Sequence, residues 1–221
     1  GIPLQFDKVY TEGISKITAQ DVKYAEDLGF RIKHLGIARR AANGIELRVH
    51  PTLIPSEELI ANVNGVKNAV LVQAHAVGPT LYYGAGAGAG PTASAVVADV
   101  IDIVRDISYT EDGAGTIPQL AFEALTNVPI LSREQMTTGY YIRLNAEDQT
   151  GVLADVTTIL SRAGISIDAI MQQSRLKDLI PIVILTDPVL ESKMDEALAQ
   201  IQALPTIHGE IIRIRLESLD S

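Results

Sequence analysis

The sequence predicts an α/β protein of the α+β type, in which a mixed-sheet domain is followed by a smaller domain with a β-α-β-β-α-β order. Three observations carry this prediction. The chain has 221 residues, a length that corresponds to one large or two small domains. Residues 1–107 mix short strand and helix patterns. Residues 139–221 instead alternate regularly between period-two and helical apolar spacing.

The first half begins with a helical pattern over residues 18–28, for which Thr18 is the expected N-cap and Gly29 the stop. Its further elements are, in chain order, strands 31–37 and 45–49 around the hairpin turn Asn43-Gly44, a short helix from Ser56, strands 68–76 and 79–83, and a helix over 92–106 directly after Pro91. The last helix has apolar residues on more than one face, which is typical of a buried helix.

A connector is expected over residues 108–138, because glycine and proline interrupt short apolar runs there. One helix is expected within it, near residues 118–125. The domain boundary is placed in this segment.

The second half has a regular order of elements. They are strand 140–145, helix 152–163, strand 165–173, strand 180–185, helix 190–204 and strand 210–217. This order predicts a split βαβ, or ferredoxin-like, fold. In the last strand Ile212, Ile214 and Leu216 alternate with Arg213 and Arg215, which is typical of a sheet with one covered and one exposed face.

The composition argues against two kinds of partner. Lys and Arg total 18 against 27 Asp and Glu, and a net charge of −9 would repel a phosphate backbone, so no nucleic acid is expected. Residues 68–98 carry no charged side chain, but their glycines and prolines argue against a membrane span, so no membrane is expected either. The absence of Cys fits a cytoplasmic location.

The glycine run from Gly84 to Gly90 is the first candidate site, because glycine lets a phosphate or a planar ring approach the backbone closely. The run does not match the dinucleotide-binding fingerprint, since no parallel strand follows the helix after it. A flexible connector explains the same residues equally well.

The turn after strand 140–145 is the second candidate site. Thr150 is a possible N-cap there, and Gly151 leaves the amides of the following helix open. A free amino acid could place its carboxylate on this helix end while Asp148 holds its ammonium group. An ordinary capped helix needs no ligand and is slightly favoured on the residues alone.

No catalytic and no metal-ligating residue is assigned. The four histidines are isolated in the sequence, without the spacing of a metal site. Glu12, Lys16 and Asp21 are charged, but nothing in the sequence pairs them as acid and base, and a solvated surface is expected for them.

Segments in the first 106 residues resemble bacterial homoserine dehydrogenase, and they occur in the family's order. The segments that carry the resemblance are Val9-Tyr-Thr-Glu-Gly-Ile14, Pro51-Thr-Leu-Ile-Pro55, Ala61-Asn-Val-Asn-Gly-Val-Lys-Asn-Ala69, Tyr83-Gly-Ala-Gly-Ala-Gly88 and Pro91-Thr-Ala-Ser-Ala-Val-Val-Ala-Asp99. From about Tyr140 the chain resembles an ACT domain, with Asp148-Gln-Thr-Gly-Val-Leu153 and Ile165-Ser-Ile-Asp-Ala-Ile170 as landmarks.

The resemblance implies an enzyme that interconverts L-homoserine and L-aspartate 4-semialdehyde with NAD or NADP, in threonine, isoleucine and methionine biosynthesis. The family's nucleotide-binding domain and its Asp-x-x-Gly-x-Asp-x-x-x-Lys segment do not occur here, so an inactive C-terminal portion is expected. Its domains would be 1–107, part of the substrate and dimerisation domain, then the 108–138 connector and the ACT domain 139–221. Helix 92–106 would belong to the absent domain, and we expect it to be poorly ordered or covered by another subunit.

The resemblance also assigns residues to the two candidate sites. Gly88, Gly86 and Ala87 would contact the nicotinamide cofactor. An amino-acid effector, which the family implies to be threonine, would bind at Asp148, Gln149, Gly151, Val152 and Leu153. A homo-oligomer, a dimer or a tetramer, is expected, with ACT domains paired edge to edge or face to face. The alternative is a non-enzymatic regulatory and dimerisation protein that binds an amino acid.

Overall fold

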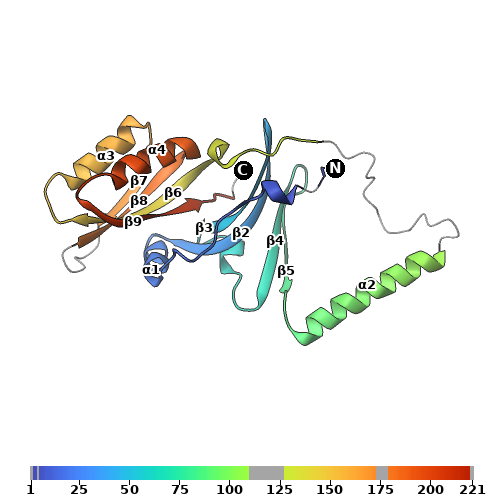
Figure 1. Ribbon diagram of the computed structural model, residues 1–221. Helices are drawn as coiled ribbons and strands as arrows, with labels where there is room; N and C mark the ends of the chain where they lie inside the picture. Colours follow the sequence, from blue (N-terminus) through green and yellow to red (C-terminus); the bar gives the residue numbers. More distant parts are fainter. Residues whose placement is uncertain (1, 4, 110–126, 173–178, 220–221) are drawn as a thin grey trace. The chain divides into compact units, whose positions relative to one another are not determined.

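The computed structural model describes residues 2–3, 5–109, 127–172 and 179–219 (Figure 1). The chain forms two compact units. Residues 5–61 and 128–221 make the first, which we call the sheet unit, and residues 1–4 and 62–127 make the second, the hairpin–helix unit. This division differs from the expected domains, because a strand from the first half pairs with the last strand of the chain. The assignment of 1–107, 108–138 and 139–221 to domains stays a prediction.

The sheet unit contains one mixed sheet with the strand order β1-β3-β9-β6-β8-β7, and β2 pairs with β3. The strands are β1 Tyr10–Thr11, β2 Phe30–Ala41, β3 Gly44–Pro55, β6 Thr137–Glu147, β7 Ile167–Gln172, β8 Leu179–Leu190 and β9 Ile207–Leu216. β3 and β9 run parallel, with Thr52 opposite Arg215 and Leu53 opposite Leu216. The expected β-α-β-β-α-β order and the mixed sheet are both confirmed.

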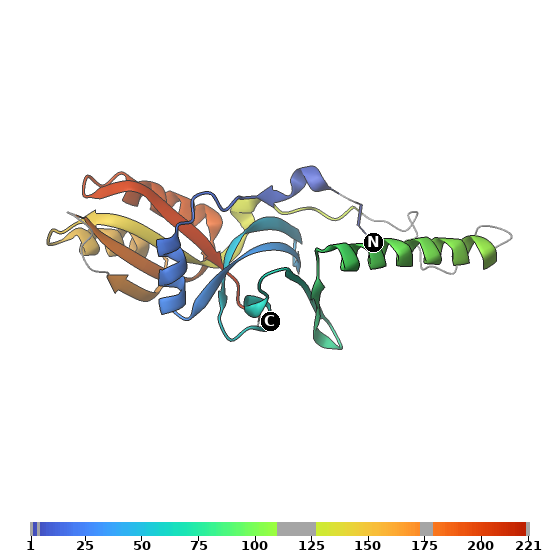
Figure 2. The same ribbon diagram turned by 90° about the horizontal axis from the view of Figure 1, so that it is seen from below.

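Helices cover both faces of this sheet (Figures 1 and 2). α3, Val152–Arg162, and α4, Glu191–Gln202, pack on one face around a core that includes Ile142, Ile184 and Leu160. α1, Ala19–Asp27, lies on the opposite face. The second core there includes Tyr24, Tyr141, Val183, Ile212 and Ile214. Short 3-10 helices occur at Phe6–Lys8, Leu59–Asn62 and Arg133–Gln135.

The covered opposite face corrects the expectation for β9. Ile212 and Ile214 pack in the core beside α1, while Arg213 and Arg215 lie on the α4 side. Arg215 is 1% exposed, so its side of the strand is buried as well. The alternation therefore places the Ile side chains in an apolar core and the Arg side chains in a second buried layer. Acidic side chains neutralise the Arg charges there.

The start of α1 is confirmed in detail, and the start of α3 is not. The Thr18 side chain accepts a hydrogen bond from the Asp21 amide, and the Asp21 carboxylate accepts one from the Thr18 amide, which makes a capping box. At α3 the N-cap is Gly151 and not Thr150, and no side chain caps the helix. Gly151 has a φ of 98°, a left-handed conformation that glycine adopts without steric cost.

Two local expectations in the first half are wrong. β2 and β3 pair down to Ala41 and Gly44, so the turn falls at Ala42 and Asn43, one residue earlier than expected. The helix expected from Ser56 is only the 3-10 helix Leu59–Asn62. Leu59 is 72% exposed, so this segment lacks the buried apolar stripe that supports a longer helix. The helix expected near 118–125 lies outside the described residues.

The hairpin–helix unit consists of β4, Lys67–Ala74, β5, Gly78–Ala85, and α2, Ala89–Tyr109. β4 and β5 form an antiparallel hairpin. α2 begins three residues before the expected Thr92. Pro91 fits in its first turn, because amides of that turn have no intrahelical acceptor.

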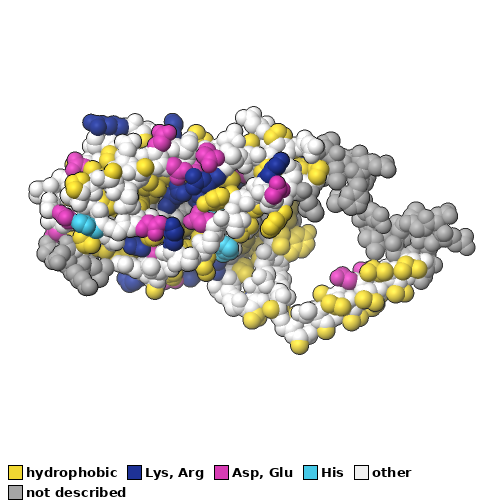
Figure 3. All heavy atoms as spheres, viewed as in Figure 1, with side chains coloured by type: hydrophobic (Ala, Val, Ile, Leu, Met, Phe, Trp, Pro, Cys, Tyr) yellow, Lys and Arg dark blue, Asp and Glu magenta, His cyan; other side chains and the backbone are white. Residues whose placement is uncertain are grey.

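Apolar side chains of α2 are exposed along its length (Figure 3). They are Val96, Val97, Val100, Ile101, Ile103, Val104 and Ile107, each between 44% and 73% exposed. Within the described chain this helix does not pack as its composition predicts, and its cover by another surface stays a prediction. No described helix is both long and apolar enough to cross a membrane.

Candidate functional site

The loop between β5 and α2 holds the three glycine-run residues assigned to the cofactor. At Gly86 an added Cβ would lie 1.7 Å from Asn68 Nδ2, so any other residue would force the Asn68 side chain to move. The Gly86 amide donates to the Val66 carbonyl at 3.3 Å. Gly88 has a φ of 119°, which L side chains rarely adopt. Two of the three residues therefore have a structural reason to be glycine.

The same loop fits a ligand that must approach the backbone closely. Residues 82–90 are exposed, so the main chain of Gly86, Ala87 and Gly88 is open to solvent. The loop leads directly into α2, whose N-terminal amides favour a negatively charged group such as a pyrophosphate.

The loop between β6 and α3 holds the residues assigned to the effector. Asp148, Gln149 and Gly151 are exposed. Because Gly151 provides no side-chain cap, the first amides of α3 have no side-chain acceptor at the N-cap. Gln149 Nε2 donates to Glu147 Oε2 at 2.6 Å, and His208 Nε2 lies 2.7 Å from Glu147 Oε1.

Val152 and Leu153 are placed differently from each other. Val152 is 4% exposed and belongs to the core under α3, so only its backbone is available to a ligand. Leu153 is 37% exposed and faces solvent at the start of the helix. The loop thus offers backbone amides and polar groups, with one apolar side chain beside them.

A buried ion pair joins α1 to the ferredoxin-like part of the sheet. Arg143 Nε donates to Asp21 Oδ1 at 2.5 Å and Nη2 donates to Oδ2 at 3.1 Å, while the Tyr141 hydroxyl donates to Oδ1 at 3.1 Å. Burial raises the pKa of Asp21, but hydrogen bonds from Arg143 and Thr18 more than offset this and the net shift is downward. Asp21 is therefore a buried carboxylate, and the expected solvated surface is wrong for it.

A second network is centred on Arg215 of β9. Its Nε donates to Glu191 Oε2 at 2.9 Å and its Nη1 to Glu12 Oε2 at 2.8 Å. Glu191, at the start of α4, also accepts from the Tyr140 hydroxyl at 2.8 Å. Burial raises the pKa of Glu191, yet the hydrogen bond and charge of Arg215 lower it on balance. Glu12 is paired too, so it is not the solvated charge that the sequence indicated.

A third network, of two arginines and one glutamate, lies where β3 meets the end of β9. Arg48 Nη2 and Arg39 Nη2 each donate to the carboxylate of Glu217. Arg48 and Glu217 are 1% and 3% exposed. All three networks therefore connect residues of the first half with residues after position 140.

Sequence reasoning missed these networks for a physical reason. Asp21 sits at the N3 position of a capping box, where it needs no distant partner. Arg215 follows the spacing of an exposed strand face. Only the presence of Arg at two alternate positions of one strand, opposite a helix that begins with Glu191, could have drawn attention to the pairing. Among the described residues, no group of three or more His, Asp or Glu could hold a metal ion.

These features define a class of protein in which the first half of the chain and a C-terminal ferredoxin-like part share one mixed sheet and are linked by buried ion pairs. The family model described as homoserine dehydrogenase matches residues 1–101, and that of the ACT domain matches residues 140–206. Proteins named homoserine dehydrogenase from Pseudomonas aeruginosa and Neisseria gonorrhoeae are 56% and 49% identical over 100% and 99% of this chain. The chain belongs to the homoserine dehydrogenase family and carries an ACT domain.

Solved structures agree with this assignment. The crystal structure of a homoserine dehydrogenase from Thiobacillus denitrificans is 56% identical, and it matches 99% of this chain with a TM-score of 0.89. A homoserine dehydrogenase from S. aureus, 22% identical with a TM-score of 0.64 over 97% of this chain, shares the fold. The chain spans about half of each relative: 51% of the Pseudomonas and Neisseria proteins, 49% of the Thiobacillus chain and 49% of the S. aureus chain.

Proposed function

We propose that this chain is the C-terminal half of an NAD- or NADP-dependent enzyme that interconverts L-homoserine and L-aspartate 4-semialdehyde. The observation that carries the proposal is the 56% identity to a homoserine dehydrogenase along the whole chain. Threonine, isoleucine and methionine biosynthesis is the pathway that this reaction would serve, and the cytoplasm is the proposed location. Alone, the 221 residues are proposed to be inactive, because the family's acid-and-lysine segment does not occur among them.

In this enzyme the loop before α2 would form one side of the cofactor site. The backbone of Gly86, Ala87 and Gly88 would lie against the nicotinamide cofactor, which supplies the hydride acceptor when it is bound. The Asn68 side chain lies against Gly86, the Gly86 amide donates to the Val66 carbonyl, and Gly88 has a φ of 119° directly before α2. The proposed role of these residues is to bind and position the cofactor, and no proton transfer is assigned to them.

The exposed apolar side chains of α2 support a further part of the proposal. A helix with Val100 and Ile103 more than half exposed has a strong hydrophobic driving force to be covered. We propose that a nucleotide-binding domain outside this sequence covers it.

Homo-oligomers, dimers or tetramers, would form through the substrate and ACT regions.

Regulation by an amino acid is proposed for the ACT domain, with threonine as the effector and the loop of Asp148, Gln149, Gly151, Val152 and Leu153 as its site. A ligand regulates only if it binds two states of the protein with different affinity. The ion pairs Asp21–Arg143 and Glu12–Arg215 would transmit a change in the ACT domain to the first half of the chain, because they fix α1 and the segment after β1 to the ACT strands.

The alternative is a separate regulatory and dimerisation protein without enzymatic activity. The proposed effector site at residues 148–153 and the ferredoxin-like fold are compatible with either function. The glycine loop favours the enzyme, because a regulatory module gives no reason for the constrained backbone at Gly86 and Gly88.

Turnover measurements test the proposed function. The 221-residue chain and a longer protein that includes the preceding domain are each assayed for homoserine-dependent reduction of NAD+ and of NADP+. The expected result is turnover by the longer protein with at least one cofactor and none by the 221 residues. Inactivity of both with either cofactor, or turnover by the 221 residues alone, would contradict the proposal.

A further inference from the structure

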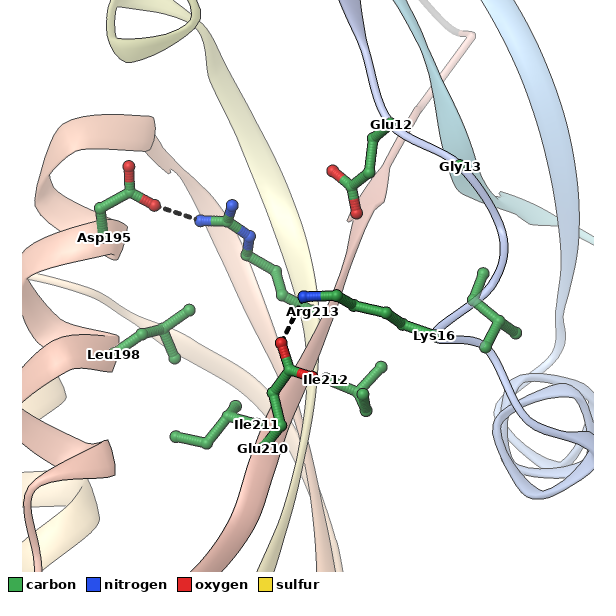
Figure 4. A pocket seen from close by; sticks show the side chains of 10 residues that line it. Glu12, Gly13, Lys16, Asp195, Leu198, Glu210, Ile211, Ile212 and Arg213 are labelled. Atoms are coloured by element: carbon green, nitrogen blue, oxygen red, sulfur yellow. Dashed lines mark hydrogen bonds and ion pairs between the residues drawn. The ribbon is translucent and has the colours of Figure 1, made fainter.

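The charged side chains that line the cavity between the segment after β1 and the α4–β9 surface are paired with one another (Figure 4). Lys16 points toward Glu210, and Arg213 pairs with Asp195. Every cation that lines this cavity therefore has a carboxylate partner, and the cavity gives no reason to expect a ligand. The side chain beside the glycine loop is different, because it contacts main chain and not another charge.

That side chain is Asn68 of β4, which the β4–β5 register brings beside the loop. Asn68 lies opposite Gly84 of β5. The Gly86 amide donates to the Val66 carbonyl at 3.3 Å, which extends the same register by two residues. Asn68 and Gly86 are therefore diagonal neighbours on one face of the hairpin, a separation that a side chain can bridge.

The contact between Asn68 and Gly86 is close and local. A Cβ added at Gly86 would lie 1.7 Å from Asn68 Nδ2, 2.6 Å from its Cγ and 3.3 Å from its Cβ. The Asn68 side chain therefore packs directly on the α-carbon of Gly86. Gly84 shares this face, yet a Cβ added there would have no atom within 4 Å. The contact is thus particular to Gly86 and does not follow from the glycine content of the run.

Asn68 and Gly86 also line one groove of about 490 Å³, together with Tyr82 and Tyr83. Ligand sites in proteins commonly have volumes of about 300–1,000 Å³. A binding loop is effective when neighbouring residues hold it to within about 0.5 Å of the productive geometry. The three atoms nearest to an added Cβ at Gly86 all belong to Asn68, so this side chain is placed to limit the movement of the loop.

We propose that Asn68 is a positioning residue of the cofactor site, which acts by packing its carboxamide against the Gly86 backbone. The inference rests on the proposed function, because it takes Gly86, Ala87 and Gly88 as the cofactor contacts. With Asn68 in place the loop is held in its binding conformation before the cofactor arrives, so less entropy is lost on binding. Asn68 is exposed, so its removal should change cofactor binding more than the stability of the chain.

Steady-state kinetics of the longer protein that includes the preceding domain test the proposal. Asn68→Ala should raise the KM for NAD+ or NADP+ about three- to tenfold, because the cofactor must then order part of the loop. The KM for homoserine should stay unchanged. Gln73→Ala removes another exposed carboxamide near the far end of β4 and is the matched control, which should change neither KM.

A double-mutant cycle with Gly86→Ala tests whether Asn68 acts through Gly86. The added methyl group would displace the Asn68 carboxamide, so the two substitutions remove the same contact. The double variant should therefore raise the KM for the cofactor less than the product of the two single effects, by about threefold or more.

NMR order parameters of the 221-residue chain provide a measurement that does not depend on turnover. Asn68→Ala should lower the order parameters of the Gly86 and Ala87 amides, and Gln73→Ala should not. Unchanged order parameters, an unchanged KM for the cofactor, equal increases in the KM for cofactor and homoserine, or fully multiplicative effects in the cycle would each overturn the proposal. Absence of turnover by the unsubstituted longer protein would instead reject the proposed function, and the order parameters would still test the contact of Asn68 with the loop.

Discussion

The two units of this chain differ in how they treat apolar side chains, which are buried in the sheet unit and exposed in the hairpin–helix unit. In the sheet unit Ile184 is 0% exposed and belongs to a core closed by α3 and α4. In the hairpin–helix unit Ile103 is 55% exposed. The difference shows that apolar content does not by itself make a core, because a second layer must cover it. A two-stranded hairpin such as β4–β5 is also marginal without further packing.

Removal of a buried charge should affect the sheet unit most. Glu191→Gln leaves Arg215 without its buried counter-ion, and we expect a loss of about 3–5 kcal/mol in the free energy of unfolding. Urea denaturation followed by circular dichroism measures this loss. Glu196→Gln, at an exposed position of the same helix, should change stability by less than about 0.5 kcal/mol. Equal stability of the two variants would show that the network is not important for the fold.

A matched pair of isoleucine truncations compares the units directly. Ile184→Ala should cost about 2–5 kcal/mol, because it leaves a cavity in a closed core. Ile103→Ala should cost less than about 0.5 kcal/mol in this chain, since its side chain has little packing to lose. Both values come from urea denaturation. A large loss for Ile103→Ala would mean that α2 is packed in solution, and the comparison would fail.

Two glycines at the start of α2 should respond in opposite directions. Gly88→Ala should destabilise the first turn by about 1–2 kcal/mol, because its φ of 119° is unfavourable for alanine. Gly90→Ala should stabilise α2 by up to about 1 kcal/mol, since no atom lies within 4 Å of the added Cβ and alanine favours helix. Hydrogen exchange of the Thr92 amide, which donates to the Gly88 carbonyl, measures both effects. Effects of the same sign would disprove the assigned backbone constraint.

His50 should make the sheet unit sensitive to mild acid. Burial lowers the pKa of His50 to about 4 from its usual 6.5, and its Nε2 has no hydrogen-bond partner among the described residues. As pH falls, His50 therefore takes up a proton in the unfolded chain at a higher pH than in the folded chain. This favours unfolding, and about 1 kcal/mol of stability should be lost between about pH 7 and about pH 5.5. His50→Gln should remove this loss, while His75→Gln, exposed in the hairpin, should not. An unchanged pH slope in His50→Gln would reject the assignment.

Several local features were predictable from the sequence, although the hairpin turn, the helix from Ser56 and the N-cap of α3 were not, and the distant pairings were not predictable at all. The N-cap at Thr18 and the β-α-β-β-α-β order depend on residues close in the chain, and both are confirmed. The parallel pairing of β3 with β9 joins residues about 160 positions apart, and no periodicity encodes it. The glycine loop was recognisable as a candidate site, but its contact with Asn68 requires the β4–β5 register.

The most direct test of this account is hydrogen exchange, measured on the 221-residue chain and on the longer protein that includes the preceding domain. The account predicts equal protection of β6, β8 and β9 in both proteins. It predicts strong protection of α2 only in the longer protein, where another surface covers Val100 and Ile103. Equal protection of α2 in the two proteins, or weak protection of the sheet in the 221 residues, would contradict the central claim that one unit is self-sufficient and the other is not.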